Sequence, residues 1–167
     1  MAVLAAWTCS AQPGLIGSTV DLSLNFPTST SVDTDYGAAT VTGGVEYPNV
    51  DYGIFQLQIT GNQLILTDIG GFSGGFVDFP FNGFDLTVVS GPGIQSAVAD
   101  ASSQFDPVGI SIVGGDQLFL NYEGDSINPG WSSVIDYSTA SVPDGGVTGL
   151  LLGGALFGLG LVRRKLA

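Results

Sequence analysis

Apolar and polar residues alternate along most of the chain between Ser18 and Tyr137. In the stretch STVDLSLNF, residues 19, 21, 23 and 25 are polar and residues 20, 22, 24 and 26 are apolar. A period of two is typical of β-strands with one buried and one solvated face. The apolar positions of the five clearest stretches are Val20, Leu22, Leu24 and Phe26; Phe55, Leu57 and Ile59; Phe84, Leu86 and Val88; Val108, Ile110 and Ile112; and Leu118, Leu120 and Tyr122.

Short turn signals separate these stretches. Gly61-Asn62 and Gly114-Gly115-Asp116 have the composition of tight hairpin connections. No part of this region shows helical periodicity over ten residues, and the spacing predicts eight or nine strands. The sequence therefore predicts an all-β fold, a single β-sandwich or jelly-roll-like domain over residues 18–137.

The C-terminal region changes character. Residues 145–162 contain no charge and are rich in Leu, and as a helix they would extend about 27 Å. This length approaches the roughly 30 Å of a bilayer hydrocarbon core, so we expect one C-terminal transmembrane helix. The alternative is a buried helix of a soluble core, which its many glycines would destabilise. Residues 138–146 are then a linker that includes the residues before the helix.

All the cations of the chain follow this apolar segment. Arg163, Arg164 and Lys165 are consecutive and lie in a tail of residues 163–167. By the positive-inside rule they form a membrane stop and remain cytoplasmic, which leaves the β domain outside the cytoplasm. We therefore expect a single-pass inner-membrane topology.

The first residues have features of an export signal. Residues 1–11 combine an apolar run with the small-residue site Cys9-Ser10-Ala11, but they lack a basic region. We interpret them as the remnant of a secretory signal peptide, with the true start codon upstream. An ordinary frayed terminus is the alternative.

Charge and composition exclude several functions. The 167 residues carry 15 carboxylates, no His and a formal net charge of −12. Such a surface repels phosphates, so nucleic acid is not an expected partner. Without His, and without a cation before Arg163, the β domain lacks a Ser-His-Asp triad and imidazole metal ligands. The sequence therefore predicts a protein that is not an enzyme and has no catalytic residues or obligatory cofactor.

Two weaker signals concern ligands of the β domain. Two pairs of closely spaced carboxylates have the composition of loops and suit a Ca²⁺ site: Asp33 with Asp35, and Glu123 with Asp125. Aromatic side chains that could stack on sugars are Tyr36, Tyr52 and Trp131. These residues could equally be ordinary turn formers and packing residues. A carboxylate-pair glycosidase is a third alternative, but the chain contains only two Glu and the sequence pairs none of its acids.

The C-terminal segment resembles a known sorting signal. Val142-Pro143-Asp144-Gly145-Gly146 precedes the apolar segment, which precedes the basic cluster. This order resembles the PEP-CTERM signal in its VPDSG-CTERM form, with Gly145 where that motif has Ser. Pro143 and the two glycines also give an extended, unhindered backbone, although the same residues suit a turn and helix N-cap. Phe81-Asn82-Gly83-Phe84 and Asp100-Ala101-Ser102-Ser103 are similar to phrases in bodies of this group, with Ala101 replacing Pro.

The resemblance implies a location and a partner. Such proteins are exported by Gram-negative bacteria that secrete exopolysaccharide, and an exosortase processes them at or near the motif. It implies that this chain is held in the inner membrane before processing and then reaches the cell surface or extracellular matrix. Extracellular polysaccharide is a further possible partner. The resemblance supplies no activity for the β domain.

Overall fold

The computed structural model describes residues 14–140, which form twelve β-strands and no helix. In chain order the strands are β1 (Thr19–Asn25), β2 (Val32–Thr40), β3 (Val45–Val50), β4 (Phe55–Ile59), β5 (Gln63–Asp68), β6 (Gly74–Gly75), β7 (Gly83–Ser90), β8 (Ile94–Ala99), β9 (Gly109–Val113), β10 (Gln117–Asn121), β11 (Ser126–Ile127) and β12 (Ser132–Thr139). The expected all-β class is confirmed for this part of the chain.

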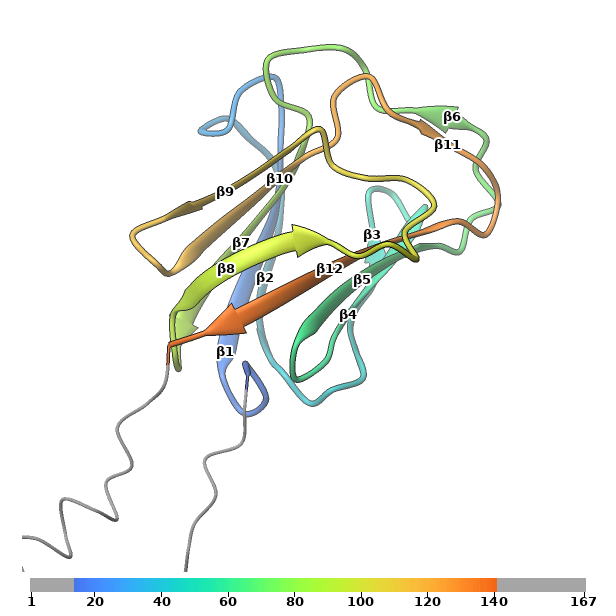
Figure 1. Ribbon diagram of the computed structural model, residues 1–167. Coiled ribbons are helices and arrows are strands. Elements are labelled where there is room, and N and C mark those ends of the chain that lie inside the picture. The colour runs from blue at the N-terminus through green and yellow to red at the C-terminus, as the bar shows by residue number, and fades with distance from the viewer. Residues whose placement is uncertain (1–13, 141–167) are drawn as a thin grey trace, which may run out of the picture. The chain divides into compact units, whose positions relative to one another are not determined.

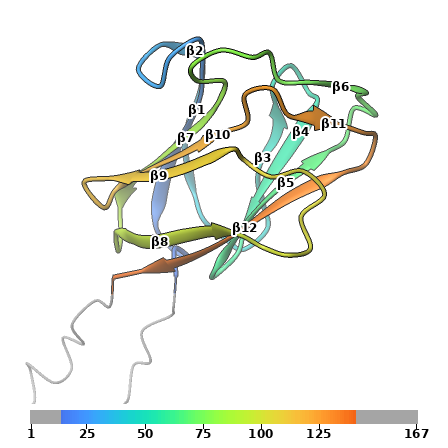
Figure 2. The ribbon, with the colours of Figure 1, turned by 45° about the horizontal axis from the view of Figure 1, so that its top comes forward.

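Ten of these strands build two five-stranded antiparallel sheets that face each other (Figures 1 and 2). The first sheet has the order β2-β1-β7-β10-β9, and the second has the order β3-β4-β5-β12-β8. The remaining two, β6 and β11, pair only with each other and lie beyond one end of the sheets. The arrangement is a sandwich-like all-β fold.

The core lies between the two sheets and uses the apolar face of each alternating strand. Leu22 on β1 and Leu86 on β7 are paired neighbours in the first sheet. They pack toward Leu57 and Leu66, which are paired neighbours on β4 and β5 of the second sheet. Each such buried Leu contributes about 1.5–3 kcal/mol relative to an exposed one. The alternation seen in the sequence therefore corresponds to burial between two layers.

One predicted strand is less buried than its pattern suggests. β9 is the outer strand of the first sheet, so it has a neighbour on one side only. Ile110 and Ile112 are half-buried against the core, and Val108, just before the strand, is 61% exposed. The pattern identified the strand correctly, but it did not show that the strand lies at a sheet edge.

The two ends of the described chain meet at one end of the sandwich. The Tyr137 hydroxyl accepts a hydrogen bond from the Leu15 N–H at 3.3 Å and donates one to the Thr60 carbonyl at 2.6 Å. β12 continues to Thr139, and the Ala140 N–H donates to the Gly93 carbonyl. The first residues of the expected linker, Ser138 and Thr139, are therefore part of a sheet.

Several expectations fall on residues outside those described: the signal remnant (1–11), the motif Val142–Gly146, the transmembrane helix (145–162) and the basic residues 163–165. Within residues 14–140, no helix is long and apolar enough to cross a membrane.

Candidate functional site

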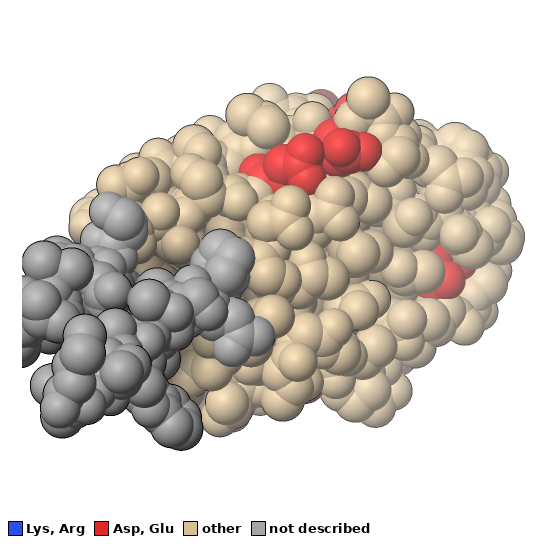
Figure 3. Space-filling model, turned by 60° about the horizontal axis from the view of Figure 1, so that its bottom comes forward, with Lys and Arg blue, Asp and Glu red and all other residues tan. Residues whose placement is uncertain are grey.

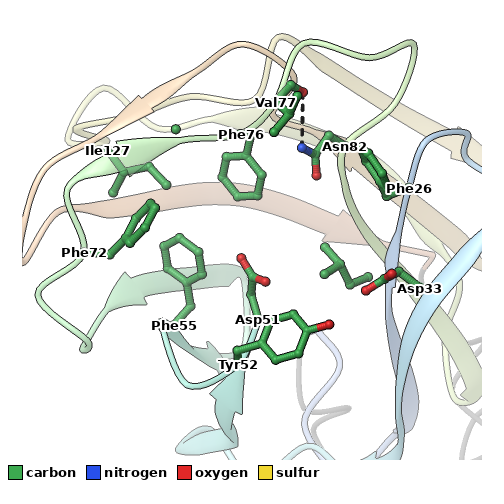
Figure 4. Close-up of a pocket in the computed structure, with 12 residues that line it drawn as sticks. Phe26, Asp33, Asp51, Tyr52, Phe55, Phe72, Phe76, Val77, Asn82 and Ile127 are labelled. Carbon is green, nitrogen blue, oxygen red and sulfur yellow. Dashed lines mark hydrogen bonds between the residues drawn. The ribbon is translucent and has the colours of Figure 1, made fainter.

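A cleft of about 330 Å³ opens at the end of the sandwich opposite to Leu15 and Tyr137 (Figure 4). Along β5, Gln63 pairs with Asp136 near Tyr137, whereas Asp68 pairs with Phe55 in the cleft. These two ends of β5 are about 17 Å apart at the rise of an antiparallel strand. The lining residues come from strand ends and the loops between them: Leu24, Phe26, Asp33, Asp51, Tyr52, Phe55, Phe72, Gly75, Phe76, Val77, Asn82 and Ile127.

Aromatic rings form one wall and the floor of this cleft. Phe55 and Phe76 lie nearly parallel, with ring centroids 5.9 Å apart and planes 4° apart. Phe76 also stacks on the fully buried Tyr122, with centroids 5.1 Å apart. Figure 4 shows Phe72 beside them on the same side of the cavity. This wall is continuous with the core, so its position is fixed by packing.

A buried carboxylate positions the Phe72 loop. Asp68 is 4% exposed, and its two oxygens accept hydrogen bonds from the N–H groups of Phe72 (3.2 Å) and Gly130 (2.8 Å). Backbone N–H groups are suitable partners for a carboxylate that has no cation nearby. Asp68 thus connects two loops behind the cleft and does not face its interior.

The rim contains a turn with an unusual backbone. Three consecutive residues, Asp51, Tyr52 and Gly53, have positive φ angles of 49°, 56° and 82°. A side chain other than Gly in this region costs on the order of 1–2 kcal/mol per residue. The turn is held by the Asp51 N–H, which donates to the Tyr36 hydroxyl at 2.7 Å, and by the Ile54 N–H, which donates to the Asp51 carbonyl. It presents the Tyr52 ring at the rim, 88% exposed.

Two carboxylates line the cleft on its other side. Figure 4 shows Asp51 pointing into the cavity and Asp33 on the strand across from it. Burial raises the pKa of the Asp51 carboxyl, and the nearby Asp33 carboxylate raises that pKa further. No described residue offsets this repulsion, since the chain has no Lys, Arg or His before Arg163. The face in Figure 3 likewise carries patches of Asp and Glu, with no basic side chain on its described part.

The polar atoms that face the cavity are mainly hydrogen-bond acceptors. The Asn82 amide donates to the Val77 carbonyl at 3.2 Å, so its own oxygen is left pointing into the cleft (Figure 4). Together with the carboxylates of Asp33 and Asp51, it offers acceptors to a ligand rich in donors. Chemically, the cleft can bind such a ligand against an aromatic wall.

The cleft also brings together a pair of acids, as the glycosidase alternative would need. Asp33 and Asp51 are near enough for the charge of one to affect the other. Sequence reasoning named Asp33 and Tyr52 but overlooked Asp51 and the Phe55, Phe72 and Phe76 wall. The triplet Asp-Tyr-Gly occurs twice, but the copy at 35–37 lies in strand β2 and only the copy at 51–53 forms a turn, so the repetition did not predict the turn.

The four carboxylates suggested for Ca²⁺ lie in two separate places. Asp33 and Asp35 are exposed on the edge strand β2, and the Asp35 carboxylate accepts the Gly37 N–H at 2.8 Å. Glu123 and Asp125 follow β10, which is three strands away in the same sheet and hence about 14 Å distant. Within residues 14–140, no three acidic, His or Cys side chains gather in a way that could hold a metal ion.

The turn around Glu123 and Asp125 is closely packed. One oxygen of each carboxylate, Glu123 Oε2 and Asp125 Oδ2, is buried without a hydrogen-bond partner in the described part of the chain. Burial is also the main cause of a raised pKa for the Asp125 carboxyl. Gly75 of β6 passes so near this turn that a β-carbon there would lie 2.4 Å from the Asp125 carbonyl oxygen.

The suggested aromatic residues have different roles. Tyr52 is on the cleft rim, whereas Tyr36 supports the rim turn from behind through its hydroxyl. Trp131 is partly buried against the core and does not line the cleft.

The segments 81–84 and 100–103, which resemble sequences in PEP-CTERM-type proteins, support the fold and do not line the cleft, apart from Asn82. Gly83 has no room for a β-carbon, which would lie 1.9 Å from the Leu120 carbonyl oxygen. Asp100 closes a turn by accepting hydrogen bonds from the N–H and hydroxyl of Ser102.

Comparison with known proteins identifies the C-terminal segment. Residues 141–166 match the VPDSG-CTERM motif, which is consistent with a sorting domain of the PEP-CTERM type. The match includes Val142–Gly146, the apolar segment and the basic cluster. No curated protein and no solved structure matches the chain.

Proposed function

We propose that this protein is an exported, non-catalytic surface or matrix protein that an exosortase processes at its C-terminal sorting signal. The observation that carries the proposal is the VPDSG-CTERM match at residues 141–166. The motif supplies the processing site at Val142–Gly146, and an acidic folded domain precedes it.

The order of the segments supports a specific route. A helix over residues 145–162 would hold the chain in the inner membrane, with Arg163, Arg164 and Lys165 on the cytoplasmic side. The β domain then lies outside the cytoplasm. Processing at or near the motif would move it from the membrane to the cell surface or the extracellular matrix.

The role of the β domain is binding or structure. The alternative function, a carbohydrate-binding module, is favoured by one observation, the aromatic cleft with its acceptor-lined side. Aromatic faces and hydrogen-bonding groups in one concave site are typical of small-molecule binding sites. A non-catalytic role fits a chain whose cleft carboxylates have no cation or imidazole beside them.

The sorting step is tested in a Gram-negative host that has its own exosortase and in the same host with that enzyme deleted. The full chain is expressed as wild type and as the Pro143→Ala/Asp144→Asn variant. We expect a shorter, released form of the wild type only where the exosortase is present. The variant should stay at full length in the membrane fraction of both strains.

A matched control removes the same two residue types from the β domain. The Asp106→Asn/Pro107→Ala variant should be processed like the wild type, because both positions lie outside the motif. Identical size and membrane retention of the wild type in both strains would refute the sorting proposal.

A further inference from the structure

The cleft concentrates negative charge without a counter-charge. The carboxylates of Asp33 and Asp51 face the same cavity, and Asp51 is partly buried there. Two neighbouring carboxylates in a partly desolvated site repel each other, and a cation between them removes the repulsion. The β domain has no Lys, Arg or His, so a cation that neutralises this pair at neutral pH comes from outside the domain.

The opposite wall suits a cation that is attached to an apolar body. Phe55, Phe72 and Phe76 line the cavity; Phe55 and Phe76 are buried and stacked on each other, so the half-buried Phe72 is the ring of this wall that a ligand reaches most easily. Aromatic faces attract ammonium groups through their negative π surface and also pack against the C–H face of a sugar ring. Tyr52 adds an exposed ring at the rim, where the strained turn holds it.

The hydrogen-bonding groups and the volume of the cleft further restrict the class of ligand that it can bind. The oxygens of Asp33, Asp51 and Asn82 are acceptors, and a protonated amine offers three donors. A volume of about 330 Å³ is near the lower limit for small-molecule pockets, so the cleft suits one or two linked rings.

We propose that this cleft binds a protonated amino-sugar unit of a polysaccharide, with the ammonium group between Asp33 and Asp51 and the sugar ring against the aromatic wall. This inference names a ligand class for the proposed surface protein. It rests on the proposed function in one respect, namely that the domain reaches the cell exterior, where polysaccharide is present. The sugar, not a simple amine, is favoured because a bare ammonium ion would fill little of the 330 Å³ cavity and would leave the apolar wall without a packing partner.

The test is calorimetric titration of the full chain, purified in detergent, at neutral pH and about 0.15 M salt, where exposed charges are screened. The probes are a glucosamine trisaccharide, its fully N-acetylated form, and tri-lysine. The glucosamine trisaccharide should bind, and the acetylated form should bind about 10- to 100-fold more weakly, since a charge-assisted hydrogen bond is lost. Tri-lysine should bind as weakly as the acetylated sugar.

Variants locate the binding. Asp51→Asn and Asp33→Asn should each weaken glucosamine binding by about tenfold or more, whereas Asp116→Asn, an equal charge change on the exposed β9–β10 turn, should change it by about twofold at most. Tyr52→Ala should weaken binding of the sugar, and Tyr52→Phe should restore it because the ring face is kept. Asp33 and Tyr52 are exposed, so these variants stay informative if Asp51→Asn unfolds, which a thermal melt would reveal.

Three results would overturn the proposal. Equal affinity for the free and acetylated sugars would show that the amine is not recognised. Equal losses in Asp51→Asn and Asp116→Asn, or tri-lysine binding as tightly as the sugar, would show a general attraction of cations to an acidic protein. Absence of glucosamine binding would also refute it, while the exosortase experiment would be unaffected. Recovery of shortened sugar would instead contradict the non-catalytic part of the proposed function.

Discussion

The Tyr36 hydroxyl accepts a 2.7 Å hydrogen bond from the backbone N–H of Asp51, so the first Asp-Tyr-Gly triplet supports the second. Tyr36 lies on β2 and Asp51 follows β3, and these are edge strands of the two different sheets. The bond therefore connects the two layers at the cleft rim. It also stabilises a backbone conformation that Asp51 and Tyr52 would not adopt by themselves.

Removing this hydroxyl should loosen the rim. We expect Tyr36→Phe to lower the free energy of unfolding by about 1 kcal/mol, the usual net value of one hydrogen bond. Hydrogen exchange at the Asp51 N–H should become faster than in the wild type. Tyr52→Phe is the control, because its ring is 88% exposed, and it should leave both measurements unchanged. Unchanged exchange at Asp51 in Tyr36→Phe would contradict the assigned role.

A second tyrosine should behave differently because its hydroxyl is fully buried. Tyr122 Oη and Ser133 Oγ are 2.9 Å apart, and both residues are 0% exposed. Tyr122→Phe leaves the Ser133 hydroxyl unpaired in the core, which should lower the free energy of unfolding by about 1–3 kcal/mol. The double variant with Ser133→Ala should recover part of this loss in urea unfolding. If the two losses simply add, the hydroxyls are not coupled.

The two glutamates should respond to amide substitution in opposite ways. The Glu46 carboxylate accepts hydrogen bonds from the Thr42 N–H and hydroxyl, from the Gly43 N–H and, through Oε2, from the Ile59 N–H at 2.7 Å. In Glu46→Gln an NH₂ group must face one of these donors, so we expect a loss of about 1–3 kcal/mol in urea unfolding.

Glu123 is the matched comparison. Its buried Oε2 has no partner among the described residues, so Glu123→Gln removes an uncompensated charge and should keep or increase the stability. A loss in Glu123→Gln as large as that in Glu46→Gln would contradict the difference between the two environments.

The stability should increase on mild acidification. Burial is the first cause of raised pKa values for the carboxyls of Asp51, Asp85 and Asp125, and neighbouring carboxylates add to it. A raised pKa means that the folded state holds the proton more tightly than the unfolded chain does. The resulting stabilisation is complete below the ordinary pKa of 3.8 and is lost as the pH rises through the raised values.

Thermal melts between neutral pH and the acid range will measure this effect. We expect the melting temperature to rise as the pH falls from neutrality toward the carboxyl range, and the rise to be smaller in Asp51→Asn. Asp100 acts in the opposite direction, since its hydrogen bonds to Ser102 lower its pKa, but it is one carboxyl against three. A melting temperature that falls steadily from pH 7 downward would contradict the prediction.

The sequence predicted four inner strands, β1, β4, β7 and β10, because burial on one face imposes a period of two, but it named no stretch for the inner strands β5 and β12. Leu22, Leu57, Leu86 and Leu118 all follow this pattern and all lie in the core. β2 and β8 were harder to predict, since edge strands have fewer buried side chains; on β2 no residue is fully buried. The two-residue strands β6 and β11 are too short to show any period.

The cleft was only partly predictable for a related reason. Asp33 and Asp51 are 18 positions apart and approach each other only because β2 and β3 lie at the edges of facing sheets. No local pattern encodes that approach. The C-terminal signal was recognisable because all its parts are contiguous in the sequence, at residues 141–166.

The placement of the cleft also determines how the domain would resist tension. A ligand held near Phe55 and a tether continuing from Ala140 would pull on opposite ends of the β5–β12 pair. The force would act along the strands, whereas the ladder hydrogen bonds run across them. The ladder hydrogen bonds would therefore be loaded together, in shear, and would not break one after another. With the proposed tether at one end and the proposed ligand at the other, the domain would therefore resist stretching along its strands.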